Sequence, residues 1–297
     1  MKKNFGNKTL VIGILILFFG ASVVSAINNN VESTEELIEI ENFKIEIEKF
    51  YPADDSEIAQ DQPNTIQGDN PSIIIRNEYG IGGSSGWASQ GLVKFDISSL
   101  PKNAIIKSAT IYLFYNKWTS TNPAGRLLDI HRITSDWSED MVTWNNKPTH
   151  HSTPTDNSPV PGSINTWIDW DVTSYVQDFV SQQENNYGWI IIDDNYWGMP
   201  EIPLTQVRSK EYSQEQSPYL EIEYVNPHMA FLFGRIENLD TEGGLTTFDA
   251  VRLRYLQFTP FSFNTYISGE KIAVANQILG IVTTNFAIGF FSSAALL

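Results

Sequence analysis

The sequence of 297 residues contains no cysteine, which excludes disulfide bonds, thiolate zinc sites and a thiol nucleophile. Basic residues are also few: 19 Lys and Arg stand against 35 Asp and Glu, giving a formal net charge of −16. Because such a surface repels phosphate backbones, nucleic acid is not an expected partner. Histidine occurs four times and never in a His-Glu-x-x-His metal motif. The 41% of hydrophobic residues nevertheless supports a buried core rather than a disordered chain.

The first 26 residues have the pattern of a secretory signal peptide. Three lysines within the first eight residues precede an apolar run over residues 10–19, and Val24-Ser25-Ala26 supplies the small residues of a cleavage site. The run is short for a bilayer span, so we predict a signal peptide over residues 1–26, with a retained N-terminal anchor as the alternative. Its removal takes away three lysines and changes the net charge from −16 to −19. We therefore expect a secreted protein, extracellular or on the cell surface.

Residues 27–42 are asparagine-rich and then acidic, which predicts a solvated acidic spacer. From residue 43 the pattern changes, because Phe43, Ile45 and Ile47 alternate with charged residues as in a half-buried strand. We place the start of the first folded domain there and its end at residue 225.

Residues 43–225 contain all eight tryptophans and many short β-type runs separated by Gly, Pro, Asn and Asp. The runs cover residues 72–75, 92–95, 109–115, 127–132, 167–171, 189–192 and 219–224. Short strands at such spacing predict an all-β fold, a jelly-roll-like β-sandwich. Val172, Val176, Phe179 and Val180 recur at helical spacing after Asp171, so we also predict one short helix that plugs one end of the sandwich.

Residues 226–297 differ because they lack tryptophan and carry no charge after Lys271. Residues 278–297 are long enough for a marginal membrane span. Polar residues interrupt this stretch, however, and Phe286, Ile288 and Phe290 alternate as in a strand. We therefore predict a smaller C-terminal β domain, and a membrane-associating tail is the alternative.

Six motifs follow one another in the central segment. They are residues 92–101 (LVKFDISSLP), 106–113 (IKSATIYL), 136–145 (DWSEDMVTWN) with Pro148, 170–173 (WDVT) with Val176 and Gln177, 186–188 (NYG), and 209–220, which begins Ser-Lys-Glu and ends Pro-Tyr-Leu. In this order they resemble the DNRLRE domain, which is related to carbohydrate-binding module family 96. The resemblance covers residues 51–225.

The resemblance implies a secreted β-sandwich that binds polysaccharide, with uronate polymers among its ligands. The sequence departs from the family pattern at two places. Lys210 stands where the family commonly has arginine, so a bidentate contact with a carboxylate would be lost. Residues 64–68 (NTIQG) stand where the family often shows Asn-Tyr-Gly.

Aromatic side chains are the first candidates for sugar binding, since their faces stack on the C–H surfaces of sugars. Trp118, Tyr196 and Trp197 lie in polar loop contexts where a large ring is expected to be exposed. Exposed single aromatics are common, so this context alone does not establish a binding role. The apolar periodicity around the other motif tryptophans predicts core packing instead; these are Trp137, Trp144, Trp170 and Trp189.

Basic side chains would hold an acidic sugar. The candidates are Lys117, Arg126, Arg132, Arg208 and Lys210. With so many acids in the chain, the alternative is that these residues form ion pairs with neighbouring carboxylates. The high negative charge makes a neutral glycan as reasonable a ligand as a uronate polymer.

Acidic side chains offer the hard oxygen ligands that Ca²⁺ prefers. The candidates are Asp54, Asp55, Asp193 and Asp194, and a structural Ca²⁺ ion is the cofactor they would hold. Their spacing does not match an EF-hand loop, and ordinary turn formation by Asp is the alternative.

The sequence thus favours a secreted, noncatalytic module that recognises a polysaccharide or cell-surface glycan through aromatic and polar side chains. The alternative is a structural or adhesive cell-surface protein without a sugar ligand. A polysaccharide-degrading enzyme is less favoured. Carboxylate pairs such as Asp169 and Asp171 exist, but such pairs arise freely among 35 acids.

Overall fold

A computed structural model describes residues 45–297, apart from residues 78, 81–82, 85, 103, 194–201, 243–244, 259–260 and 264–265. The predicted signal peptide and acidic spacer lie outside the described residues, as do three candidate site residues, Asp194, Tyr196 and Trp197. Among the residues that are described, no helix has the length and apolar character needed to cross a bilayer.

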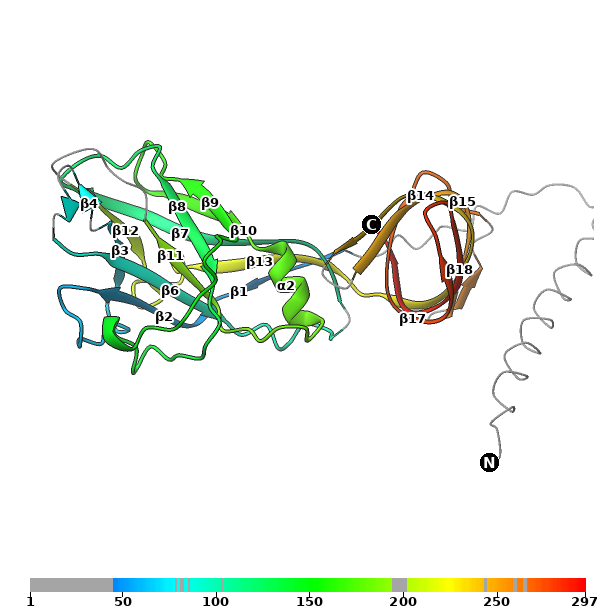
Figure 1. Cartoon of the computed structure of the whole chain (residues 1–297), viewed down its shortest axis with the longest axis horizontal. Coiled ribbons are helices and arrows are strands. Elements are labelled where there is room, and N and C mark those ends of the chain that lie inside the picture. The colour runs from blue at the N-terminus through cyan, green and yellow to red at the C-terminus, as the bar shows by residue number, and fades with distance from the viewer. Residues whose placement is uncertain are drawn as a thin grey trace, which may run out of the picture. The chain divides into compact units, whose positions relative to one another are not determined.

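Two antiparallel sheets form the β-sandwich seen in Figure 1. Sheet A consists of β1 (Ile45–Phe50), β3 (Ser72–Ile75), β7 (Ile105–Thr119), β10 (Thr166–Asp171), β12 (Leu204–Arg208) and β13 (Tyr219–Val225). Sheet B consists of β2 (Pro52–Ala59), β6 (Ser89–Phe95), β8 (Leu127–Arg132), β9 (Asp156–Pro159) and β11 (Trp189–Ile192). The short strands β4 (Tyr79–Gly80) and β5 (Gly83–Ser84) pair with each other, and η1 (Trp144–Asn146) is a single 3₁₀ turn.

Alternating residues of the two sheets make the core. On β7, Ile111 and Leu113 point inward and are buried, whereas Tyr112 between them is only half-buried. Trp170 of β10 and Trp189 of β11 are fully buried in the same core. The period-2 pattern therefore decides which ring enters the core and which stays at the surface.

The helix α2 (Thr173–Val180) packs against the start of β7 at one end of the sandwich (Figure 1). Its apolar side chains Val176, Phe179 and Val180 join the core. Gln177 fixes the position of the helix, because its Oε1 accepts a hydrogen bond from the Ile106 backbone N–H at 2.9 Å.

A second hydrophobic cluster covers the outer face of sheet B. Ile190 and Ile192 of β11 point away from the main core and are buried by the segment that follows β8. Trp137 and Val142 of that segment are the main covering side chains. As a result all four residues of β11 are buried.

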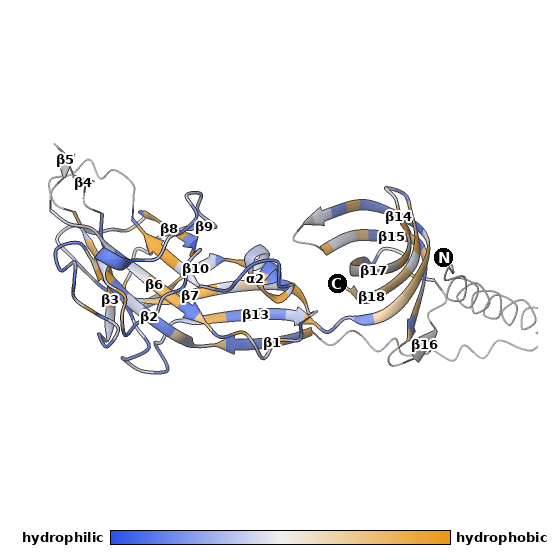
Figure 2. Ribbon diagram, turned by 60° about the horizontal axis from the view of Figure 1, so that its bottom comes forward, coloured by the Kyte–Doolittle hydropathy of each residue, from blue (hydrophilic) through white to orange (hydrophobic). Residues whose placement is uncertain are grey.

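The C-terminal residues form a separate sheet. Its strands are β14 (His228–Glu242), β15 (Leu245–Phe258), β16 (Phe261–Phe263), β17 (Lys271–Val282) and β18 (Phe286–Leu296). β14 pairs with both β15 and β18. Buried side chains of these strands, such as Phe248 and Tyr255 of β15, form a hydrophobic cluster of their own. Figure 2 shows the alternation of hydrophilic and hydrophobic residues along β14.

The predicted fold class is confirmed: an all-β sandwich with a short helix and a smaller C-terminal β domain. The alternation at Phe286, Ile288 and Phe290 belongs to β18, and residues 278–297 lie mainly in β17 and β18.

Candidate functional site

The outward side of sheet A carries a group of aromatic side chains from three neighbouring strands. Tyr112 of β7 pairs in register with Tyr219 of β13 on one side and with Asp169 of β10 on the other. Trp167 of β10 lies opposite Phe114 of β7. Strand pairing thus brings together residues that are far apart in the sequence.

Tyr112, Trp167 and Tyr219 are half-buried and in ring contact, and we call them the aromatic face. The rings of Tyr112 and Tyr219 stack, with centroids 4.6 Å apart and planes at 18°. Trp167 meets the Tyr219 ring at 5.0 Å and the Tyr112 ring at 6.5 Å, edge to face in both cases. Phe114 packs against Trp167 at 5.1 Å from a nearly buried position. Such mutual contacts restrict the rings, so the face is formed before any ligand arrives.

Charged groups border the aromatic face. Lys49 of β1 lies over the Tyr219 ring at 4.2 Å, and its Nζ is 3.1 Å from Glu221 Oε2. The hydrogen bond with Glu221 raises the pKa of Lys49 above its usual value. Burial, together with the neighbouring charge of Glu221, raises the pKa of Tyr112 and of Tyr219. Both phenols therefore keep their protons at neutral pH and can donate hydrogen bonds.

The predicted basic anchors lie mostly in contacts with other protein groups. Arg126 binds Asp193 through Nε at 2.8 Å and Nη2 at 2.6 Å. Arg132 is 3.3 Å from Glu184 and stacks on the Tyr175 ring at 4.8 Å.

Arg208 and Lys210 follow each other closely in the chain and also have protein partners. The guanidinium of Arg208 lies 3.4 Å from the centre of the Tyr212 ring and donates a hydrogen bond to Ser72. The Lys210 ammonium contacts Glu139 and the Ala53 carbonyl.

Lys117 and Trp118 lie near the end of β7, and both are exposed, Trp118 to 39%. Trp118 pairs in register with Thr205 of β12, so it belongs to a strand rather than to a loop. The remaining predicted aromatic residues, Tyr196 and Trp197, lie outside the described residues. The structure thus does not bring the predicted ligand-binding residues together at one place among the residues it describes.

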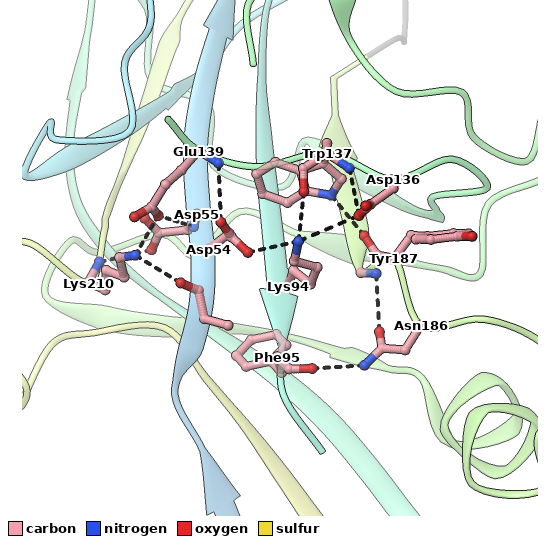
Figure 3. A network of polar contacts seen from close by, with 12 residues as sticks. Asp54, Asp55, Lys94, Phe95, Asp136, Trp137, Glu139, Asn186, Tyr187 and Lys210 are labelled. Carbon is pink, nitrogen blue, oxygen red and sulfur yellow. Dashed lines mark hydrogen bonds and ion pairs between the residues drawn. The ribbon is translucent and has the colours of Figure 1, made fainter. Parts of the chain in front are cut away.

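Motif residues instead form a network of buried and half-buried polar groups, drawn in Figure 3. We call Asp54, Asp55, Lys94, Glu139 and Lys210 the polar network. Lys94 Nζ lies 2.8 Å from Asp54 Oδ2 and donates to the Trp137 carbonyl at 2.7 Å. Asp54 Oδ1 accepts from the Glu139 backbone N–H at 3.2 Å.

The polar network continues from Glu139 to the segment after β12. Glu139 Oε2 accepts from the Asp55 backbone N–H at 3.1 Å and also contacts the Lys210 ammonium. Asp55 Oδ2 accepts from the Lys210 backbone N–H at 2.9 Å. The network therefore joins β2, β6, the segment that covers sheet B, and the residues after β12.

The adjacent Asn-Tyr-Gly motif anchors the segment before β11. Asn186 Nδ2 donates to the Phe95 carbonyl at 2.8 Å, and Trp137 Nε1 donates to the Tyr187 carbonyl at 2.8 Å (Figure 3). Gly188 has φ of +80°, and a Cβ at this position would lie 2.2 Å from the Val93 carbonyl oxygen. Only glycine fits this close approach of two backbones.

The three predicted metal ligands that the structure describes do not form one cluster. Asp54 pairs with Lys94 and Asp193 with Arg126, whereas Asp55 groups with Glu139 and Glu211, whose carboxylate oxygens lie within 4.8 Å of one another. The Lys210 ammonium contacts Glu139 and lies 3.7 Å from Glu211, so a positive group already occupies this cluster.

Asp55 is fully buried, and its Oδ1 has no hydrogen-bond partner. Burial raises the pKa of Asp55 to about 8, and the nearby carboxylates of Glu211 and Glu139 add to the shift. The described contacts are those of a structural ion-pair network, in which burial favours the protonated form of Asp55.

The aromatic face was not among the site residues predicted from the sequence, although part of its signal was present. On β10, Ile168 and Trp170 point into the core. Trp167 lies on the opposite side of the strand, together with the exposed Asp169 and Asp171. An aromatic residue on the same side of a strand as two acids points outward. The contact with Tyr112 and Tyr219 could not be found in this way, because it depends on the register of three strands.

Comparison with known proteins agrees with the motifs. A search of curated proteins found no match to the chain. The model of carbohydrate-binding module family 96 matches residues 46–224, from the first strand of sheet A to its last. With both sheets of the sandwich and more than half of the sequence included in this match, the chain belongs to carbohydrate-binding module family 96.

Proposed function

We propose that this protein is a secreted, noncatalytic module that binds a polysaccharide on the aromatic face of sheet A. Membership of the family supports a carbohydrate ligand. The predicted signal peptide over residues 1–26 supports secretion. The observation that carries the location is the contact between Tyr112, Trp167 and Tyr219, three partly exposed rings on adjacent strands.

The chemistry of such a face suits a sugar chain. Aromatic rings pack against the C–H surfaces of pyranose rings, and the phenol hydroxyls donate hydrogen bonds to sugar oxygens. A sheet spreads these groups along a surface, so successive sugar units of one polymer can contact it. Binding on a partly exposed surface gives a modest affinity per module, which several modules or a repeating polymer raise by multivalency.

The polar network has a different role in this proposal. Its acids and lysines bind one another, so it holds the strands in register and does not contact the ligand. The absence of catalysis is part of the proposal, and incubation of bound polymer with the protein is expected to release no shorter product. Detection of oligosaccharides in that incubation would contradict it.

Removing a ring of the aromatic face tests the location. Trp167→Ala or Tyr219→Ala should lower the affinity for polysaccharides on an array by at least about tenfold, as for central aromatic residues of other interfaces. Tyr266→Ala, in the connection between β16 and β17, is a matched control, because Tyr266 is 50% exposed and lies outside the sandwich.

Trp118→Ala separates this location from the earlier sequence-based candidate. If Trp118→Ala abolishes binding and Trp167→Ala leaves it unchanged, the ligand binds at the end of β7 and the proposal that it binds at the aromatic face is wrong. If no neutral or acidic polymer binds, the structural or adhesive alternative is favoured.

A further inference from the structure

The charges around the aromatic face are mainly negative. The outward positions that continue from the rings along their own strands carry Asp169 and Asp171 on β10, and Glu221 and Glu223 on β13. The register places Glu221 and Asp171 on opposite sides of Thr110 of β7. Four carboxylates therefore follow the rings along the surface of sheet A.

One lysine opposes them on the described part of the neighbouring strand β1. Lys49 pairs in register with Glu221, and its Nζ is 3.1 Å from the Glu221 carboxylate. This pairing leaves Asp169, Asp171 and Glu223 as the surplus of negative charge. Asp169 is the closest of these to the rings, because it is exposed and stands directly opposite Tyr112.

Four of the five basic candidates have protein partners. The fifth, Lys117, is exposed on β7 beyond the Phe114–Trp167 pair, on the side of the rings away from the four carboxylates. Arg126 binds Asp193, Arg132 contacts Glu184, and the Lys210 ammonium contacts Glu139. Arg132 belongs to β8 of sheet B and Lys210 to the polar network, so neither offsets the charge beside the rings. A carboxylate or sulfate on a sugar at the aromatic face would thus meet like charges.

An uncharged sugar meets a favourable surface at the same place. Carboxylates accept strong hydrogen bonds from hydroxyl groups, and vicinal sugar hydroxyls can bind both oxygens of one carboxylate. The phenols of Tyr112 and Tyr219 supply donors in addition, since the pKa of each is raised. Acceptors and donors therefore lie beside a stacking surface.

We infer that the aromatic face selects polysaccharides that carry no acidic groups, with Asp169 as a specificity-determining residue that accepts hydroxyl hydrogen bonds and repels sugar carboxylates. This inference rests on the proposed function of the aromatic face. It narrows the ligand class, because uronate polymers and neutral glycans were equally open from the sequence.

The test uses matched pairs of polymers that differ only at C6 of each sugar unit. Suitable pairs are β-1,4-glucan with β-1,4-polyglucuronate and β-1,4-mannan with β-1,4-polymannuronate, as soluble oligomers titrated calorimetrically with EDTA present. At least one neutral member should bind, and it should bind better than its oxidised partner by about tenfold, the combined effect of exposed charges worth about two- to fivefold each. The gap should narrow on going from about 20 mM to about 500 mM salt, because salt screens exposed charges.

Asp169→Asn tests the residue itself. The variant should bind the neutral oligomer a few-fold less tightly and the oxidised oligomer a few-fold more tightly. Glu215→Gln provides a control with the same loss of charge, since Glu215 is exposed and lies in the turn before β13. Weaker binding of the neutral oligomer together with tighter binding of the oxidised oligomer, seen in Asp169→Asn but not in Glu215→Gln, supports the assignment. Equal effects in the two variants overturn it.

Failure of this inference is distinguishable from failure of the proposed function. If a uronate oligomer binds more tightly than its neutral partner and Trp167→Ala abolishes that binding, the aromatic face is the site but the inferred selectivity is wrong. If binding occurs and is insensitive to Trp167→Ala and Tyr219→Ala, the proposed function of the face is wrong. If no oligomer binds, both proposals fall.

Discussion

The polar network and the aromatic face are two clusters in one sandwich, and they differ in how they relate to the family motifs. Each charged side chain of the polar network belongs to a motif or lies next to one: Lys94, Glu139 and Lys210 are motif residues, and they bind Asp54 and Asp55 of β2. Of the three rings in the aromatic face, Tyr112 and Tyr219 lie within motifs, but the central contact also requires Trp167, which precedes the motif at residues 170–173.

Physical chemistry explains this difference. A charge that is removed from water must have a partner with defined geometry, so the polar network tolerates few residue types and spacings. A ring on a sheet surface needs only an outward position and a neighbour. The motifs therefore identify the fold, but they include only two of the three rings of the aromatic face.

The largest expected loss of stability comes from a backbone position in the motif next to the polar network. Gly188→Ala should lower the free energy of unfolding by about 3 kcal/mol or more, because the added Cβ would overlap the Val93 carbonyl and strain a positive φ. Gly125→Ala is the matched control: its φ is also +80°, but no atom lies within 4 Å of its Cβ position. The control should lose only about 1 kcal/mol in urea unfolding. Equal losses would show that the close approach to β6 is not important.

Breaking the polar network should cost less but still affect stability alone. Glu139→Ala removes the partner of the Lys210 ammonium and of the Asp55 N–H, and should lower the free energy of unfolding by about 2 kcal/mol, less than a fully buried pair because both side chains are about one-fifth exposed. Glycan affinity of the folded variant should not change. A loss of affinity with unchanged stability would mean that the network contacts the ligand.

Asp55 should give the stability of the protein a pH dependence. In the unfolded chain its pKa is near 3.8, and in the folded protein burial raises it to about 8. Between about pH 4 and pH 8 the folded protein therefore holds a proton that the unfolded chain does not hold. Stability should fall as the pH rises through this window and level off above it, with a slope of at most about 1.4 kcal/mol per pH unit.

Asp55→Asn removes the titrating group and keeps an oxygen for the Lys210 N–H. Its melting temperature should change less between pH 5 and pH 9 than that of the unmodified protein. Parallel pH profiles for Asp55→Asn and the unmodified protein would contradict the raised pKa.

The smallest expected effect concerns the departure from the family at residue 210. Lys210→Arg restores the more common residue and a planar group that can bind Glu139 with two hydrogen bonds. We expect the free energy of unfolding, measured by thermal denaturation, to rise by about 0.5 kcal/mol or less, because the pair is partly exposed. A loss of more than 1 kcal/mol would show that the site fits only the lysine ammonium, which also contacts the Ala53 carbonyl.

Much of the sandwich could be predicted from the sequence, since β7, β10 and α2 have clear apolar periodicity and β11 is a short continuous apolar run. β2 could not, because its buried positions include Asp55, Ser56 and Glu57. Glu57 is accommodated by hydrogen bonds from the Ile74 N–H at 2.9 Å and the Ser89 hydroxyl at 2.7 Å. Partners from distant strands make these residues acceptable inside, and periodicity along one strand does not reveal such partners.

The candidate site was predicted less well for the same reason. Local context indicated the exposure of Trp118, and the excess of acids gave ion pairs as the alternative for Arg126 and Arg132, but neither identified the acids that bind the two arginines. The three rings of the aromatic face come from strands joined by long connections. Their contact is a property of the register between strands, which is settled only by the complete fold.

The pairing of β1 with β13 has a mechanical consequence. Ile45 stands opposite Val225 and Phe50 opposite Leu220, so the polypeptide enters and leaves the sandwich through partners whose Cα atoms are about 5 Å apart. A domain whose first and last strands are paired in this way adds almost no length between the residue where the chain enters it and the residue where the chain leaves it. Tension applied across residues 45 and 225 would separate β1 from β13 one residue pair at a time, so the sandwich should open from this end at low force.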